Sequence, residues 1–188
     1  LRAEQIAANE TQAKGITPAK PPRWITGDSR NTATLAAGEY DLVFSCPPYA
    51  DLEVYSDNPL DLSTMKYDDF LKAYQEIIAQ AVGMLKPNRF ACFVVGDIRD
   101  KKGFYRNFVS DTISAFQGAG AKLYNEAILV TSVGSLPIRV GRQFEAGRKL
   151  GKTHQNVLVF CKGDPKKAVA DCGMVEVHDP AENFGEVV

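Results

Sequence analysis

The segment Asp41-Leu-Val-Phe-Ser-Cys-Pro-Pro-Tyr49 constrains the fold more than any other part of the chain. Leu42 to Phe44 form a continuous apolar run, which is typical of a strand buried inside a sheet. Two prolines then end the strand, because each proline fixes its own φ angle and has no N–H to donate. The segment therefore predicts a buried strand that runs into a rigid turn, with carbonyl oxygens that lack neighbouring donors.

Helical and strand patterns alternate on both sides of this segment. Apolar residues at helical spacing predict helices over 3–14, 31–36, 67–85 and 104–116. Short apolar runs predict strands over 23–26, 41–45, 90–95, 122–133 and 155–161. Glycine, proline and polar residues predict loops over 50–66 and 134–152, and the tail after Gly163 shows little pattern.

This alternation predicts an α/β fold of Rossmann-like type, with a mostly parallel sheet and helices on both faces. No helix is expected between the final two strands, so the last strand is expected to be antiparallel. We expect one domain over residues 1–163, followed by a C-terminal tail over 164–188. In open α/β sheets ligands bind beyond the carboxyl ends of the strands. The loops that carry Asp28-Ser29, Cys46 to Tyr49, and Asp97 should therefore converge on one rim.

Composition excludes several broad classes of protein. Hydrophobic residues make up 45% of the 188 residues and charged residues 24%, which argues against a disordered chain. No apolar run reaches about 18 residues, so no membrane-spanning helix is expected. The four cysteines follow no recognisable signal peptide, which favours reduced thiols and a cytoplasmic location. The cysteines and histidines lack paired short spacings, so no metal site is expected.

The turn at Cys46 to Tyr49 has the chemistry needed to hold an amine. An exocyclic base amine carries two N–H groups, and each needs an acceptor. A rigid carbonyl oxygen of the proline turn can accept one, and Cys46 can accept the other. Tyr49 can stack on the face of a flipped base. Accepting both hydrogens aims the nitrogen lone pair, so the amine can attack a methyl donor directly.

This segment resembles motif IV of the amino-methyltransferases, in which Asp, Asn or Ser precedes Pro-Pro-Tyr. Cys46 takes that first position here, and a thiol is a weak acceptor. Residues 152–163 resemble a late strand of the same family, with Gln155 in place of its usual acidic residue. The remaining segments that match in the family's order are 1–10, 27–29, 67–88 and 90–97. The resemblance is closest to phage and bacterial DNA methylases.

The resemblance implies an S-adenosylmethionine-dependent, site-specific DNA methyltransferase of a phage or a restriction-modification system, which methylates N6 of adenine or N4 of cytosine. It implies cofactor contacts at Asp28, Ser29 and Cys46. It also implies that the catalytic residues are Cys46, Pro47, Pro48 and Tyr49. The family's glycine-rich cofactor loop does not occur in this sequence. That loop and the first strands are therefore expected upstream of Leu1.

The predicted loop 134–152 is the strongest candidate for contact with DNA. Its five basic residues stand against one acid, Glu145. The net charge of the chain is only −1, so a DNA contact must come from a local basic patch such as this one. The predicted DNA-binding residues are Arg139, Arg142, Arg148, Lys149 and Lys152. A solvated run of charge is the alternative interpretation.

Several alternatives remain open at this stage. The same proline turn could serve an RNA or protein amine methyltransferase. The weak acceptor Cys46 would also suit a non-catalytic, degenerate methylase that keeps only its DNA contacts. Cys46 could act as a nucleophile, as in enzymes that methylate carbon 5 of cytosine, although those enzymes carry Pro-Cys rather than Cys-Pro. Asp28 and Asp97 could be simple turn residues that cap the local backbone.

Overall fold

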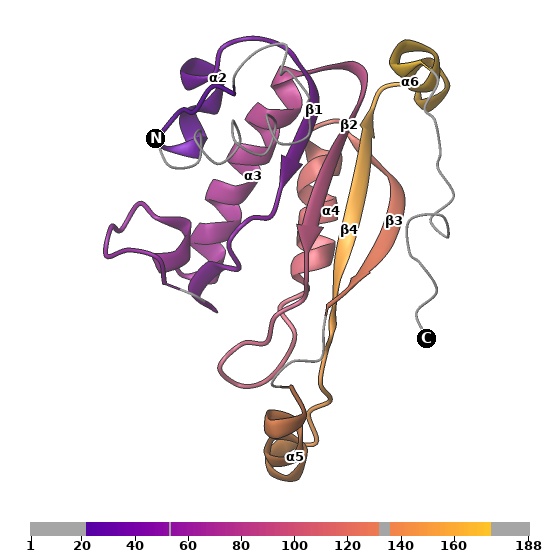
Figure 1. The fold of residues 1–188 in the computed structure, drawn as a ribbon. Coiled ribbons are helices and arrows are strands. Elements are labelled where there is room, and N and C mark those ends of the chain that lie inside the picture. Colours follow the sequence, from indigo (N-terminus) through magenta and orange to yellow (C-terminus); the bar gives the residue numbers. More distant parts are fainter. Residues whose placement is uncertain (1–21, 53, 132–135, 174–188) are drawn as a thin grey trace, which may run out of the picture.

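The computed structural model describes residues 22–52, 54–131 and 136–173. These residues form an α/β fold with one sheet, shown in Figure 1. The strands are β1 (Tyr40–Ser45), β2 (Leu85–Val95), β3 (Lys122–Val130) and β4 (His154–Lys162). The helices are α2 (Thr32–Leu35), α3 (Tyr67–Met84), α4 (Phe108–Gly118), α5 (Leu136–Gly147) and α6 (Pro165–Cys172), with short 3-10 turns at η1 (Ser29–Asn31), η2 (Ala50–Leu52) and η3 (Leu62–Thr64).

The sheet is mixed, and its strand order is β1-β2-β4-β3. β1 and β2 are parallel, whereas β4 is antiparallel to both β2 and β3. The expected antiparallel last strand is therefore confirmed. The expectation of a mostly parallel sheet does not hold for the described strands, because β4 lies between β2 and β3 and is antiparallel to both. β1, β2 and β3 run in the same direction, so their carboxyl ends lie at the same rim of the sheet (Figure 1).

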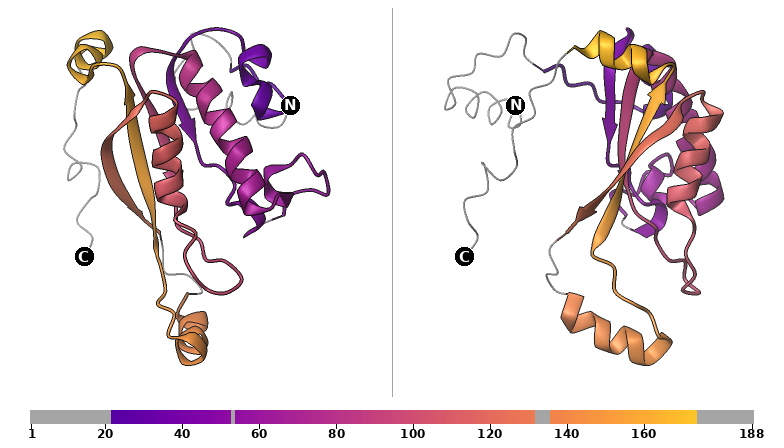
Figure 2. Two further views of the ribbon diagram at one scale, coloured as in Figure 1. Left: turned by 180° about the vertical axis from the view of Figure 1, so that it is seen from behind. Right: turned by 90° about the vertical axis from the view of Figure 1, so that its right-hand side faces the viewer.

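Helices α3 and α4 cover one face of this sheet (Figure 2). Helix α3 buries Phe70, Tyr74 and Ile78, which recur at helical spacing along one side of the helix. Against this layer the sheet presents Phe93 and Phe160, both nearly inaccessible to solvent. The expected helices on the second face are not among the described residues. Leu42 and Phe44, which point to that face, are 58% and 63% exposed.

One predicted strand is absent from the described sheet, and one predicted helix begins later than expected. The expected strand over 23–26 is not part of the sheet, and Trp24 is 60% exposed. A short apolar run becomes a strand only where a neighbouring strand supplies its hydrogen bonds, and β1 pairs only with β2 among the described residues. The expected helix over 104–116 begins four residues late, because Asn107 adopts a left-handed conformation with φ of 58°.

Two helices occur where the sequence pattern indicates none. Helix α5 lies within the predicted loop 134–152. Its proline is in the first turn, where a missing N–H costs nothing, and Arg148 follows its end with φ of 52°. Helix α6 follows Gly163, where the pattern is weak. The Asp164 carboxylate accepts the N–H of Lys166 and caps the helix, with Pro165 in its first turn. The domain boundary at residue 163 remains a prediction.

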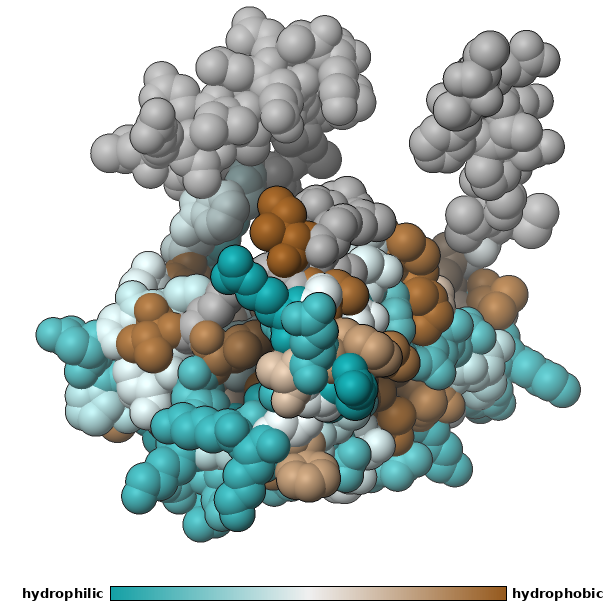
Figure 3. All heavy atoms as spheres, turned by 90° about the horizontal axis from the view of Figure 1, so that it is seen from below, coloured by the Kyte–Doolittle hydropathy of each residue, from teal (hydrophilic) through white to brown (hydrophobic). Residues whose placement is uncertain are grey.

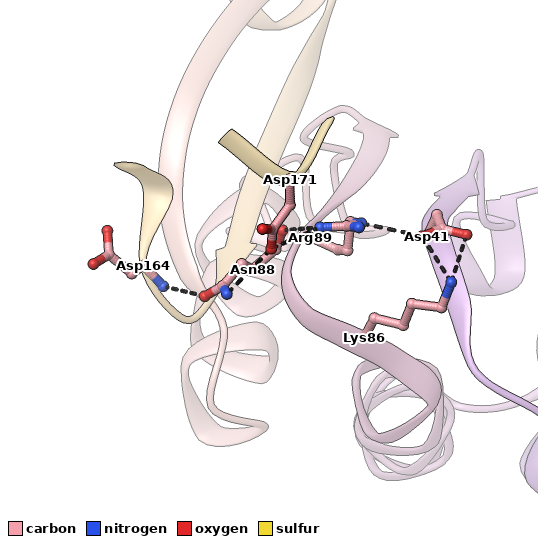
Figure 4. A network of polar contacts seen from close by, with 6 residues as sticks. All are labelled: Asp41, Lys86, Asn88, Arg89, Asp164 and Asp171. Atoms are coloured by element: carbon pink, nitrogen blue, oxygen red, sulfur yellow. Dashed lines mark hydrogen bonds and ion pairs between the residues drawn. The ribbon is translucent and has the colours of Figure 1, made fainter. Parts of the chain in front are cut away.

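A network of ion pairs connects α6 to the amino end of β1 (Figure 4). Arg89 on β2 stands at its centre and bonds to Asp41 at 3.1 Å and to Asp171 at 3.2 Å. Lys86 reaches Asp41 from the other side at 2.9 Å. The network fastens the end of the sheet that lies opposite the carboxyl ends of β1 and β2.

The Lys162 side chain, at the end of β4, caps the carboxyl end of helix α3. Its ammonium donates to the carbonyl oxygens of Val82 at 2.7 Å, Gly83 at 3.3 Å and Leu85 at 2.5 Å. The last carbonyls of a helix have no partner inside the helix, and a cation there also interacts favourably with the helix dipole.

We expect Lys162→Met to lower the free energy of unfolding by about 1–3 kcal/mol, because it removes a charged donor from carbonyls that are partly buried. Urea unfolding followed by circular dichroism measures the change. Lys167→Met is the matched control, since Lys167 is exposed on α6. Equal stability of the two variants would show that Lys162 does not stabilise the end of α3.

Candidate functional site

Two neighbouring hollows open where β1 ends. The first, called here the turn pocket, has a volume of about 280 Å³ and is lined by Cys46, Pro47, Pro48, Tyr49, Tyr55 and Gln155. The second, the Asp28 pocket, has a volume of about 410 Å³, and its lining includes Gly27, Asp28, Ser29, Asn58, Leu60 and Ile77. Pro48 lines both hollows. The expected convergence of the loops at residues 28–29 and 46–49 is therefore confirmed.

Tyr49 is held firmly in the turn pocket. Its hydroxyl oxygen accepts a hydrogen bond from Nε2 of Gln155 at 2.5 Å. The edge of its ring meets the ring of Phe108, with centroids 5.6 Å apart and an angle of 75° between the planes. Gln155 lies 106 residues further along the chain, at the start of β4. Sequence comparison marks Gln155 only as a departure from a family pattern, and the structure places it against the proline turn.

Asp28 is an ionised acceptor that already has a partner. Its carboxylate caps η1 by accepting the N–H of Arg30 at 2.9 Å, and it also pairs with the Arg30 guanidinium at 2.6 Å. The hydrogen bonds from Arg30 hold the pKa of Asp28 below its ordinary value of 3.8. A donor group entering the Asp28 pocket must therefore share this carboxylate with Arg30.

The loop over residues 50–66 forms a wall of both hollows. Tyr55 lines the turn pocket, and Asn58, Leu60 and Asp61 line the Asp28 pocket. The loop is ordered by its own polar groups. Asp61 accepts from the N–H of Ser63 at 2.9 Å, and the Ser63 hydroxyl accepts the N–H of Tyr55 at 3.0 Å. Movement in this loop would alter both hollows together.

An ion pair joins this loop to the loop that follows β2. Asp51 accepts from Nη1 of Arg106 at 2.6 Å, and the Arg106 guanidinium lies over the ring of Tyr67 at 4.8 Å from its centroid. The backbone N–H of Arg106 donates to the carbonyl of Ile98 at 2.9 Å. Arg106 keeps the pKa of Asp51 below its ordinary value of 3.8.

Asp97 serves a structural purpose. Its carboxylate accepts the N–H of Val109 at 3.1 Å, in the first turn of α4, and it lines neither hollow. The capping interpretation of Asp97 is therefore favoured.

The basic residues predicted to contact DNA occupy two places. Arg142 and Lys149 line a shallow hollow along α5, and the Arg148 guanidinium lies 5.2 Å from the ring centroid of Phe144. Lys152 lies beside the turn pocket instead. A Cβ atom built on Gly96 would lie 3.8 Å from Lys152 Nζ and also 3.8 Å from the Tyr49 hydroxyl. The side chain of Arg139 lies outside the described part of the structure.

Helix α5 projects beyond the carboxyl ends of β1 and β2 (Figure 1). Seen from that end, the molecule presents long hydrophilic side chains interspersed with separate hydrophobic ones (Figure 3). Ile138 on α5 and Leu150 after it are 81% and 73% exposed.

Two further properties hold for the described residues. No helix among them is long and apolar enough to cross a membrane. Among the same residues, no group of three or more His, Cys, Asp or Glu side chains is arranged to hold a metal ion.

Comparison with known proteins gives a clear result for the fold alone. No protein-family model and no curated protein matches this chain. The solved structure of TTHA0409 from Thermus thermophilus, described as a DNA modification methylase, matches 84% of this chain and 58% of its own at 18% identity, with a TM-score of 0.52. Its complex with S-adenosyl-L-methionine matches 74% of this chain and 52% of its own at 18% identity, with a TM-score of 0.50.

The chain therefore has an α/β fold of the S-adenosylmethionine-dependent methyltransferase type. It spans about half the length of the solved structures that it matches. Its described sheet of four strands is smaller than the sheet of a full Rossmann fold. The structural similarity to DNA modification methylases, expected from the proline turn, is confirmed at low sequence identity.

The Asp51–Arg106 pair predicts a dependence of stability on pH. The folded-state pKa of Asp51 is depressed, so its stabilisation is fully present above 3.8 and is lost as the pH falls through the lower folded value. A partly exposed pair of this kind contributes up to about 1 kcal/mol. We expect the melting temperatures of the wild type and Asp51→Asn to converge as the pH is lowered from 6 to 3. Asp57→Asn, at an exposed position in the same loop, should instead follow the wild type.

Proposed function

We propose that this chain transfers a methyl group from S-adenosylmethionine to the exocyclic amine of adenine (N6) or cytosine (N4) in DNA. The observation that carries the proposal is the rigid turn at Pro47-Pro48, which stands between two neighbouring hollows. Direct methyl transfer needs a donor site and an acceptor site that share a boundary, and Pro48 lines both hollows. The fold shared with TTHA0409, which has been solved with S-adenosyl-L-methionine, supports the same assignment.

The Asp28 pocket fits the adenosyl part of the cofactor. Leu60, Leu62 and Ile77 give it apolar walls that suit a flat ring, and the Asp28 carboxylate can accept the adenine amine. Ser29 lies beside Asp28 in the same lining. Bound S-adenosylmethionine would supply an electrophilic methyl group on a sulfonium centre. Cys46 lines the turn pocket rather than the Asp28 pocket, so its contact with the cofactor remains a prediction.

The turn pocket would hold the target base. The rings of Tyr49 and Tyr55 line it, and either ring can stack on a flipped base. A carbonyl oxygen of the Pro47-Pro48 turn accepts one amine hydrogen. The amine nitrogen then forms a bond to the methyl carbon while the carbon–sulfur bond breaks and its electron pair stays on sulfur. The extra proton on the methylated amine leaves to water, so no side chain has to act as a base.

Two alternatives make different predictions. An RNA or protein amine methyltransferase would use the same turn for another amine. A non-catalytic DNA-binding protein with a degenerate site is favoured by one observation, the weak acceptor Cys46 at the mouth of the turn. Mass spectrometry of nucleosides from DNA incubated with the protein and S-adenosylmethionine separates these cases. N6-methyladenine or N4-methylcytosine supports the proposal, and unmodified DNA that is nevertheless bound supports the second alternative.

Replacing Tyr49 tests the base site. We expect Tyr49→Ala to lower methyl transfer by at least roughly 10–100-fold, because stacking one base on an aromatic ring is worth about 1–3 kcal/mol. Affinity for S-adenosylmethionine, measured by calorimetry, should change little because Asp28 lies in the other hollow. Tyr124→Ala is the control, since Tyr124 stacks on Phe90 far along the sheet. A parallel loss of cofactor affinity in Tyr49→Ala would contradict this division between the hollows.

The basic side chains of α5 can be tested by the dependence of DNA affinity on salt. If Arg142 and Arg148 each contact a phosphate, replacing both with Ala should reduce the slope of log affinity against log salt by about 1.8. Replacing Lys166 and Lys167 on α6 removes the same charge at the opposite end of the molecule and should leave the slope unchanged (Figure 1). Fluorescence anisotropy with duplex DNA at several salt concentrations measures both slopes. Equal slopes for the two double variants would remove α5 from the DNA interface.

A further inference from the structure

The turn pocket contains a strong hydrogen-bond acceptor that stands close to the weak one. An amine held for direct methylation needs acceptors for two hydrogens, and the Cys46 thiol holds the second poorly. Among the described side chains that line this pocket, Gln155 is the one that carries a carboxamide oxygen. Carboxamide oxygens are good acceptors with two lone pairs. The pocket therefore offers a second strong hydrogen-bond acceptor, which the proline turn and Cys46 do not provide.

The position of Gln155 is fixed by the fold and by Tyr49. Its Nε2 donates to the Tyr49 hydroxyl at 2.5 Å, which holds the carboxamide beside the tyrosine that would stack on the base. Its Cγ lies 3.8 Å from the place that a Cβ would take on Gly96. Gln155 and the Tyr49 hydroxyl therefore meet beside Gly96, just beyond the end of β2. Within the described residues the carboxamide bonds through its nitrogen to Tyr49, and no described group donates to its oxygen, which can therefore accept from a ligand.

We propose that Gln155 is a catalytic residue whose Oε1 accepts the second hydrogen of the target amine, in place of the residue that precedes the two prolines. This inference rests on the proposed function and names the group that completes the amine site. The carbonyl oxygen of the proline turn accepts one N–H and Gln155 accepts the other. A neutral carboxamide takes no proton at neutral pH, so the proton released after methyl transfer still goes to water.

The arrangement also determines which bases fit. A base with an NH2 group offers the two hydrogens that the two acceptors require. A base with a carbonyl oxygen at the same place would bring three acceptor oxygens together, and once the base fills the pocket the two protein acceptors would stay unpaired. Leaving such groups unpaired discriminates strongly against the wrong ligand. Gln155 therefore selects for adenine or cytosine and against thymine.

The first test needs no catalytic activity. The full chain labelled with ¹⁵N is titrated with adenosine and cytidine, which carry the amine, and with purine riboside, which lacks it. The side-chain amide signal of Gln155 is assigned from its absence in Gln155→Met. We expect the amine-bearing nucleosides to shift this signal and purine riboside to shift it much less. The side-chain amide of Asn156, which donates to Glu126 at 2.7 Å, is the internal control. Equal shifts, or none, would overturn the inference.

The second test uses methyl transfer and separates catalysis from positioning. Gln155→Met keeps the length of the side chain and removes the acceptor, and we expect kcat to fall roughly 10-fold or more with a smaller change in KM. Gln155→Met also loses the bond to Tyr49, so Cys46→Asn is added to restore an acceptor at the family's position. Recovery of kcat in the double variant supports the inference. A double variant as slow as Gln155→Met would show that Gln155 only positions Tyr49 and would overturn it.

The two tests together distinguish this inference from the proposed function. A wild-type chain that methylates no DNA, while amine-bearing nucleosides still shift the Gln155 signal, rejects the proposed function and retains the amine site. A wild-type chain that methylates DNA with an unchanged rate in Gln155→Met rejects the inference alone. Asn156→Leu, one residue along the same strand, should leave the rate unchanged in either case.

Discussion

The pairing of β2 with a strand on each side determines where every group of the candidate site lies. β2 is parallel to β1, with Ser45 opposite Phe93, and antiparallel to β4, with Asn156 opposite Val95. The end of β1 and the start of β4 therefore flank the end of β2. The proline turn that follows β1 and Gln155 on β4 meet above Gly96 for this reason. Had β4 been parallel to β2, Gln155 would lie at the opposite rim of the sheet.

The two rims of the sheet differ in the use they make of polar groups. At the amino end of β1, charged side chains bond to one another or to backbone: Arg89 bonds to Asp41 and Asp171, and Lys162 bonds to the end of α3. At the other rim, Asp51 pairs with Arg106 and Asp97 bonds to the backbone of α4, but other polar side chains there line open hollows that a ligand could enter. The ion pairs and hydrogen bonds at the amino end of β1 thus stabilise the fold without filling the candidate site.

Sequence periodicity is sufficient for the central elements and insufficient for the site as a whole. The strand at 41–45 and the helix at 67–85 carry strong apolar patterns, and both were predicted closely. Helix α5 was missed because the glycines and proline of the predicted loop 134–152 are typical of a loop, although a proline in the first turn is compatible with a helix. The contact between Tyr49 and Gln155 joins positions 106 residues apart, and a local sequence pattern cannot predict a contact over that distance. The expected antiparallel last strand was the one signal that could have brought Gln155 to the turn.

The charges of the two hollows bear on which amine the turn could hold. The described side chains that line the turn pocket are uncharged, and the nearby charge is the Lys152 ammonium, which would repel another ammonium. The Asp28 pocket instead contains an ionised carboxylate. A lysine side chain is an ammonium ion at neutral pH and has no lone pair to attack a methyl group until it loses a proton. A base amine is neutral already and is flat, so it can stack on Tyr49 and donate both hydrogens to neutral oxygens. An uncharged pocket with an aromatic wall and two acceptors thus favours a nucleobase amine over the amine of a protein.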